Sequence, residues 1–300
     1  MKEVFIVKRR KKYKAGDIVM DTIIVLILLF VLVTTFYPMW YVFVASLSNG
    51  TEIAKHPGIM LWPKQIGTQA YQMVAAHPLI LNSSKNTLTI LAMALPINMV
   101  MTILCGYFMS CTNMFWKKPI VALIMFTMFF NGGLIPGFLN VKSLGLYNTF
   151  WAVVLPGALS VYNAIICKTA MEAIPDSLKE SAYIDGANDF KMLFKIIIPL
   201  MKPTLAVLAL YYGVGTWNDW FNASIYLKDN SMLPIQNILR AVLLENSAAL
   251  NSNAAGDNYS QYAESIKYAA IIVSTVPILC VYPFLQKYFT KGVMIGAVKG

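Results

Sequence analysis

Residues 180–200 read ESAYIDGANDFKMLFKIIIPL, and this stretch decides how the rest of the chain is interpreted. Acidic residues, lysines, an isolated glycine and a proline follow one another here, whereas the flanking segments are strongly apolar. Ser177 and Glu180 have the S-x-x-E spacing of a capping box, which predicts a helix that starts near Asp176. Pro199 suits the first turn of the helix that follows. The stretch therefore predicts a charged helical insert between two apolar segments.

The composition of the 300-residue chain indicates an integral membrane protein. It is 58% hydrophobic and 13% charged, with a mean hydropathy of +0.60, far more apolar than a domain that faces water. Crossing a bilayer takes about 20 apolar residues. Six segments meet that length: Thr22 to Thr51, Thr87 to Trp116, Pro119 to Val141, Ser143 to Cys167, Ile197 to Phe221 and Tyr268 to Gln286. The expected fold is an all-α membrane protein with six transmembrane helices.

The net charge of +10 gives the orientation of these helices and does not indicate a nucleic-acid partner. With the N-terminus in the cytoplasm, 17 of the 24 lysines and arginines fall in cytoplasmic segments and 7 in outer segments. This asymmetry satisfies the positive-inside rule. Both termini and the charged insert are therefore expected in the cytoplasm, and the long segments 47–85 and 222–267 outside the cell.

The segments between the spans set the expected organisation of the chain. NGGLIPGF, residues 131–138, is expected to break a helix because it combines two glycines with a proline. PIQNILRAVLLEN, residues 234–246, has apolar residues at helical spacing and predicts a short amphipathic helix. The expected parts are a basic tail (1–17), a first span (18–46), an outer loop (47–85), a core (86–287) with a charged loop (173–199) and an outer loop (222–267), and a second tail (288–300).

The four cysteines show no pattern of pairing or of metal binding. Cys105, Cys111, Cys167 and Cys280 form no C-x-x-C pair, so they predict neither a disulfide framework nor a metal site.

The charged insert could be a solvated loop helix without a partner. However, a helix that exposes residues such as Ile184, Phe190, Leu193 and Phe194 would leave an apolar patch, and such patches usually mark an interface.

The spacing within the insert resembles that of a known family. Glu180, Ser181, Ala182 and Gly186, followed after nine residues by Ile196, Ile198 and Pro199, resemble the E-A-A-x3-G-x9-I-x-L-P loop of bacterial ABC importer permeases. Ser181 replaces an alanine of that pattern, and Ile198 replaces its leucine. In that family the loop forms coupling helices that dock into a cleft of the ATPase subunit.

The resemblance covers nearly the whole chain. FNGGLIP (130–136), SLGLYNTFWAVVLPGALS (143–160), GTWNDWF (215–221) and YFTKGVMIGAVKG (288–300) are similar to the MalG-like second permease of maltose-type carbohydrate importers. They most resemble the LplC or YtcP subgroup, which handles oligosaccharides released from polysaccharides. The resemblance implies a MetI-like permease fold in the bacterial cell membrane. It also implies three partners: an LplB-like second permease, an ATPase dimer and an extracellular solute-binding lipoprotein.

The resemblance also assigns a docking role to particular residues. No GxxxxGK[ST] phosphate loop occurs in the sequence, so the chain is expected not to be an enzyme and to hold no cofactor of its own. ATP and magnesium would be bound by the partner ATPase. The implied docking residues are Glu180, Ser181, Ala182, Asp185, Gly186, Ile196 and Pro199, with Lys291 and Lys299 of the C-terminal tail as a further ATPase contact.

TWNDWF, near the outer end of the fifth span, is the first candidate for the substrate pathway. Tryptophan rings offer flat faces to sugars, and amide or carboxylate groups bind hydroxyls. An aromatic belt at the membrane interface is the competing interpretation. The candidate residues are Trp217, Asn218, Asp219, Trp220 and Asn222, with Asn131 and Tyr147 as weaker ones.

Other functions remain as alternatives. A secondary transporter driven by an ion gradient would be expected to carry acidic residues or histidines within its spans. His56 and His77 lie instead in the first outer loop, and no aspartate or glutamate lies in the middle of a span. A membrane enzyme would need a catalytic cluster, and the sequence shows none. An ABC permease for another class of solute is the third alternative.

Overall fold

The computed structural model describes residues 15–55, 58–63, 65–76, 78–111, 115–251, 264–281 and 283, and its elements are helices. The first half of the described chain contains α1 (Ala15–Ser46), α2 (Gly50–Lys55), α3 (Gln69–Ala76), α4 (Pro78–Ser110), α5 (Lys117–Phe129), α6 (Leu134–Ser143) and α7 (Phe150–Val154). The second half contains α8 (Val161–Glu172), α9 (Asp176–Ile184), α10 (Asp189–Met192), η1 (Leu193–Ile197), α11 (Ile198–Leu200), α12 (Lys202–Asn218), α13 (Phe221–Tyr226), η2 (Asn230–Met232), α14 (Ile235–Asn251) and a final helix, Glu264–Val281.

Three described helices are long and apolar enough to cross a membrane. They are α1, α4 and the final helix, Glu264–Val281. Two bent pairs, α5 with α6 and the segment Asp189–Leu200 with α12, bring the number to five if each pair forms one span. The all-α membrane fold is confirmed, although several of the six expected spans are broken rather than continuous.

The breaks occur where the backbone cannot continue a helix. α5 and α6 meet at 115°, and Gly133 between them has φ +92°, a conformation that L side chains rarely adopt. This confirms the break expected at residues 131–138. The expected fourth span is also interrupted, because Pro156 and Gly157 separate α7 from α8. The fifth span is shorter than expected, since the chain bends by 84° before Lys202.

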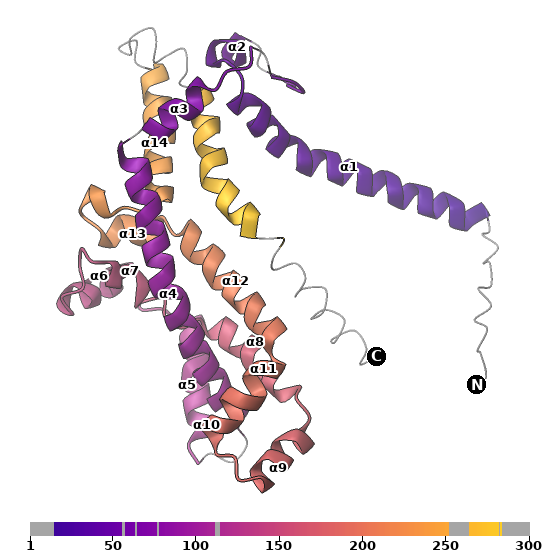
Figure 1. The fold of residues 1–300 in the computed structure, drawn as a ribbon, viewed down its shortest axis with the longest axis vertical. Helices are drawn as coiled ribbons and strands as arrows, with labels where there is room; N and C mark the ends of the chain where they lie inside the picture. Colours follow the sequence, from indigo (N-terminus) through magenta and orange to yellow (C-terminus); the bar gives the residue numbers. More distant parts are fainter. Residues whose placement is uncertain are drawn as a thin grey trace.

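The centre of the fold is α4, which packs against α8 and α12 (Figure 1). The approach of α8 is close at Gly106, where an added Cβ would lie 2.9 Å from the Cβ of Cys167 and 3.2 Å from the backbone nitrogen of Lys168. Only glycine therefore fits at this crossing. By contrast, α1 stands away from the rest of the fold over most of its length, and residues 16–36 are exposed.

The two ends of α4 contact different parts of the chain. At its first turns, the side-chain amide of Asn86 donates to the carbonyl of Ser231 (2.7 Å), and the hydroxyl of Thr87 accepts from the backbone N–H of Ile235 (2.9 Å). At its last turns it contacts the charged loop, residues 173–199, which includes α9 and α10 (Figure 1). The segments expected on opposite sides of the membrane thus lie at opposite ends of one helix.

The outer segments are more ordered than a plain loop. The stretch 47–85 contains α2 and α3, and α4 already begins in it, at Pro78. The reason is packing: α3, α14 and the final helix share a buried apolar cluster, and Leu79 and Ile80 of α4 pack against it. The amphipathic helix expected at residues 234–246 is confirmed as α14, with Ile238 and Val242 facing that cluster.

Candidate functional site

The charged loop is built on an apolar core that it shares with α8 and α12. Its buried side chains include Ala182, Ala187, Met192, Leu193 and Ile197, and they form one cluster with Cys167, Met171, Ile174, Met201 and Leu208. Because protein interiors are close-packed, a force applied to this loop is transmitted to both helices. The loop is therefore a rigid extension of the helix bundle.

Hydrogen bonds from two tyrosine hydroxyls connect the same loop to α4. One carboxylate oxygen of Asp189, Oδ1, accepts hydrogen bonds from the hydroxyls of Tyr183 (2.8 Å) and Tyr107 (3.1 Å). Tyr183 belongs to α9 and Tyr107 to α4. The bond to Asp189 raises the pKa of the Tyr183 hydroxyl, because the carboxylate stabilises the protonated phenol. Three separate elements meet at this carboxylate.

The turn after α9 is a Schellman motif. The N–H of Gly186 donates to the carbonyl of Tyr183 (3.0 Å), and the N–H of Ala187 donates to the carbonyl of Ala182 (2.9 Å). Gly186 has φ +75°, the left-handed conformation that this motif requires, and no atom lies within 4 Å of a Cβ added there. The capping box predicted at the start of α9 is wrong. Pro175 is the N-cap and makes no side-chain cap hydrogen bond, although the helix does start at Asp176.

The loop exposes several large apolar side chains among its polar ones. Ile184 is 86% exposed and Phe190 70% exposed, and Phe194 and Leu178 are exposed as well. Side chains of this size cost free energy in water, roughly 1.5–3 kcal/mol each relative to burial. An exposed patch of this kind indicates a surface that another protein covers.

Not every residue expected on the docking face lies there. Glu180, Ser181, Asp185 and Gly186 are exposed on the loop, and Pro199 is exposed in α11. Ala182 is 7% exposed, and Ile196 packs against the same core. These two residues therefore anchor the loop and do not form its surface. Lys291 and Lys299 lie outside the described residues.

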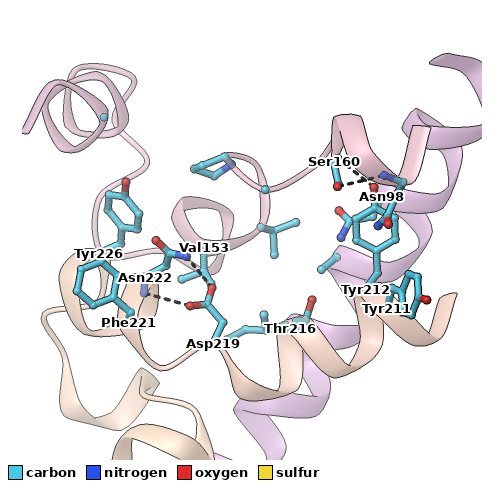
Figure 2. Close-up of a pocket in the computed structure, with 18 of the residues that line it drawn as sticks. Asn98, Val153, Ser160, Tyr211, Tyr212, Thr216, Asp219, Phe221, Asn222 and Tyr226 are labelled. Atoms are coloured by element: carbon cyan, nitrogen blue, oxygen red, sulfur yellow. Dashed lines mark hydrogen bonds between the residues drawn. The ribbon is translucent and has the colours of Figure 1, made fainter. Parts of the chain in front are cut away.

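A cavity of about 860 Å³ opens between the helices (Figure 2). Its walls come from α4, the bend between α5 and α6, the segment that joins α7 to α8, α12 and α13. Asp219 is the one charged residue among those that line it. Its Oδ2 accepts a hydrogen bond from the side-chain amide of Asn222 (2.9 Å), and its Oδ1 accepts one from the backbone N–H of Asn222 (3.2 Å).

Three of the seven candidate substrate residues line this cavity: Asn131, Asp219 and Asn222. The tryptophans do not. Trp217 is 7% exposed, and its indole N–H donates to the carbonyl of Ser274 (3.1 Å), so it holds α12 against the final helix. The guanidinium of Arg240 lies 3.7 Å from the ring centroid of Trp220 and covers that ring.

The remaining two candidates also lie outside the cavity lining. The side-chain amide of Asn218 donates to the carbonyl of Val214 on its own helix, and Tyr147 contacts the ring of Phe138. The structure thus shows contacts within the protein, and not with the cavity, for four residues that the sequence placed on the substrate pathway.

The sequence analysis missed the polar residues at the other end of the cavity. Figure 2 shows Asn98, Ser160 and Tyr212 close together, and Asn163 also lines the cavity. Each lies within a segment that was assigned to the membrane on its average hydropathy alone. A signal was present, because Asn98 and Thr102 are four residues apart and so share one face of a helix. The described residues include no cluster of three or more metal-ligating side chains.

Comparison with known proteins gives one family. Residues 86–295 match the family described as "Binding-protein-dependent transport system inner membrane component". The chain is 37% identical over 264 residues to the Polygalacturonan/rhamnogalacturonan transport system permease protein YtcP of Bacillus subtilis (strain 168), covering 88% of this chain and 92% of that one. It is also 37% identical over 266 residues to Protein LplC of the same organism, covering 89% and 90%.

A solved structure is similar over the same region. A chain from the crystal structure of a bacterial ABC transporter involved in the import of the acidic polysaccharide alginate has a TM-score of 0.82 and 29% sequence identity. The match covers 92% of this chain and 99% of that one.

Proposed function

This chain belongs to the family of binding-protein-dependent transport system inner membrane components, and from that premise we propose that it forms half of the membrane pathway of an importer for oligosaccharides released from a polysaccharide. The exposed apolar side chains of the charged loop are the observation that carries the proposal. A loop that is packed rigidly against α8 and α12 but exposes Ile184 and Phe190 is suited to receive a partner and to pass its movement to the bundle.

The proposed partner at this face is an ATPase dimer that binds the ATP and magnesium. The sequence carries no phosphate-binding P-loop, so we assign this chain a transport role and no nucleotide site. Glu180, Ser181 and Asp185 would give polar contacts around the apolar centre formed by Ile184. The further proposed partners are a second permease and an extracellular solute-binding lipoprotein, with both termini of this chain in the cytoplasm.

The mechanism follows from the position of α4. This helix carries the cavity residues Ala94 and Asn98 at its middle and Tyr107, bonded to the charged loop, near its end. Closure of the ATPase dimer would move the loop, and the loop would move α4, α8 and α12 together. Switching of the cavity between the two sides is then a population shift driven by contacts that differ between the states.

The oligosaccharide assignment has two supports. The relative YtcP is a permease of a polygalacturonan/rhamnogalacturonan transport system, and the similar solved chain belongs to a transporter involved in the import of alginate, an acidic polysaccharide. The cavity itself combines one carboxylate with amides and hydroxyls, which are the groups that hydrogen-bond to sugars.

Asp219 gives a test of the cavity as the substrate pathway. We expect Asp219→Ala to lower sugar uptake by the assembled importer about 10-fold or more, because a hydrogen bond to a charged group contributes about 1.5–3 kcal/mol. Uptake of labelled oligosaccharide into vesicles that contain the importer is the measurement.

The matched control is Asp229→Asn. Asp229 is an exposed carboxylate of the same outer region that does not line the cavity, and its Oδ1 accepts from the backbone N–H of Ser231. An asparagine there keeps that acceptor, so uptake should be unchanged. Equal uptake by the Asp219→Ala variant and the wild type would remove Asp219 from the pathway.

A further inference from the structure

One end of the cavity is lined by Asn98, Ser160 and Tyr212, and we call it the inner end. One polar side-chain atom at this end has no hydrogen-bond partner in the described part of the chain. Asn98 lines the cavity and is 4% exposed, and its side-chain oxygen Oδ1 is buried without a hydrogen-bond partner. A buried acceptor without a donor is unfavourable by about 1–3 kcal/mol. Buried polar groups in native proteins are otherwise nearly always paired. This exception is best explained by a partner that the chain itself does not supply.

The protein groups beside Asn98 are already engaged with one another. The hydroxyl of Tyr212 lies 2.6 Å from the hydroxyl of Thr102 and accepts the backbone N–H of Ser160 at 3.0 Å. The hydroxyl of Ser160 in turn accepts the backbone N–H of Asn163. Figure 2 shows Tyr212 and Ser160 next to Asn98 at this end of the cavity. These bonds hold the wall in shape, and none of them reaches Oδ1 of Asn98.

We infer that Asn98 is a sugar-binding residue, whose carboxamide accepts a hydrogen bond from a hydroxyl group of the oligosaccharide at the inner end of the cavity. The inference rests on the proposed function and adds a subsite to it.

The chemistry of the lining favours an uncharged hydroxyl as the bound group. A hydroxyl can donate to Oδ1, whereas an ionised carboxylate only accepts hydrogen bonds. The residues that line the cavity include the carboxylate of Asp219 and neither lysine nor arginine. This wall therefore does not supply a positive charge to an acidic sugar group, and it matches the neutral, hydroxyl-bearing face of a sugar.

The test measures sugar binding and uptake separately. Galactotriose, a neutral trisaccharide, serves as the probe. Its dissociation constant is measured by NMR on the assembled membrane complex in nanodiscs without the solute-binding protein. We expect Asn98→Leu to raise this constant about 3- to 10-fold, the effect of one neutral hydrogen bond. Asn98→Asp keeps an acceptor of the same shape and should stay within about 2-fold of the wild type.

Thermal stability separates a binding role from a structural one. Asn98→Leu replaces an unsatisfied acceptor by an apolar group of similar size, so the unfolding midpoint of the complex should stay the same or rise. Thr89→Val is the control on the same helix, because the hydroxyl of Thr89 donates to the carbonyl of Lys85 on its own helix and Thr89 does not line the cavity. It should leave galactotriose binding unchanged.

Each outcome decides a specific claim. If Asn98→Leu bound galactotriose as the wild type does, whatever its unfolding midpoint, Asn98 would not be a sugar-binding residue. The subsite would then be overturned while the proposed function stands. Absence of measurable galactotriose binding to the wild-type complex would overturn the subsite as a site for a neutral sugar. Absence of ATP-dependent uptake for both galactotriose and trigalacturonate would instead contradict the proposed function.

Discussion

Gly186→Trp is expected to abolish ATP-dependent transport. Gly186 lies on the exposed turn after α9, beside Ile184, where the ATPase is proposed to dock. Apart from its two chain neighbours, no described residue has an atom within 4 Å of a Cβ at this position, so the described fold has room for the ring. The proposed docking surface has no room for the ring, because a bulky indole would hold the two proteins apart. The loss of ATPase from the purified complex and the loss of uptake are the measurements.

The control for this variant is Gly186→Asn. Any side chain other than hydrogen is strained at φ +75°, by roughly 1–2 kcal/mol, but asparagine tolerates the left-handed conformation better than other residues. Gly186→Asn should therefore retain the ATPase and most of the uptake. If Gly186→Trp assembled with the ATPase and transported at the wild-type rate, this turn would not be a docking surface.

The second large effect is expected at the crossing of α4 and α8. Gly106→Leu should prevent the chain from accumulating as a folded protein in the membrane. Even its Cβ would lie 2.9 Å from the Cβ of Cys167, so the helices would have to separate. Overpacking of this kind costs about 1–3 kcal/mol, and more where backbone must move, as it must here beside Lys168. The amount of chain in the membrane and its unfolding midpoint measure the effect.

Gly213→Leu is the matched substitution. Gly213 is also a glycine within a long helix, α12, but an added Cβ there meets nothing within 4 Å. Leucine also has a higher helix propensity than glycine, which is about 0.8–1 kcal/mol less favourable than alanine in a helix. We expect this variant to accumulate normally. Normal accumulation and stability of Gly106→Leu would mean that α4 and α8 do not cross as closely as described.

The sequence predicted the charged loop well because its acidic residues and lysines interrupt an otherwise apolar chain. The interruption of an apolar pattern gave the position of α9, and the fixed spacing of Glu180, Gly186 and Pro199 gave the resemblance. Which residues of the loop are buried and which are exposed was harder to predict. Ala182 and Ile196 are part of the spacing pattern, but Ala182 is buried and Ile196 is partly buried, because the turn at Gly186 folds α10 back onto α8 and α12.

The cavity could not be predicted in the same way. It is formed by segments far apart in the chain. Its polar residues lie within apolar segments, where they hardly change the average hydropathy. Tryptophan near the end of a span indicated a sugar site. However, Trp217 bonds to Ser274 of the final helix, a contact that depends on tertiary packing. The break at Gly133, by contrast, is a local backbone effect and was predicted from the residues themselves, whereas the break at Pro156 interrupts a segment that the sequence predicted as one continuous span.

The central claim is that the charged loop of this chain receives an ATPase. The most direct test is to solubilise the native complex gently through a tag on this chain, after crosslinking from a cysteine that replaces Glu180, and to identify the bound proteins by mass spectrometry. We predict an ATPase joined at that position, together with a second permease and a solute-binding lipoprotein. Recovery of this chain alone or with copies of itself, without an ATPase even after crosslinking, would contradict the claim.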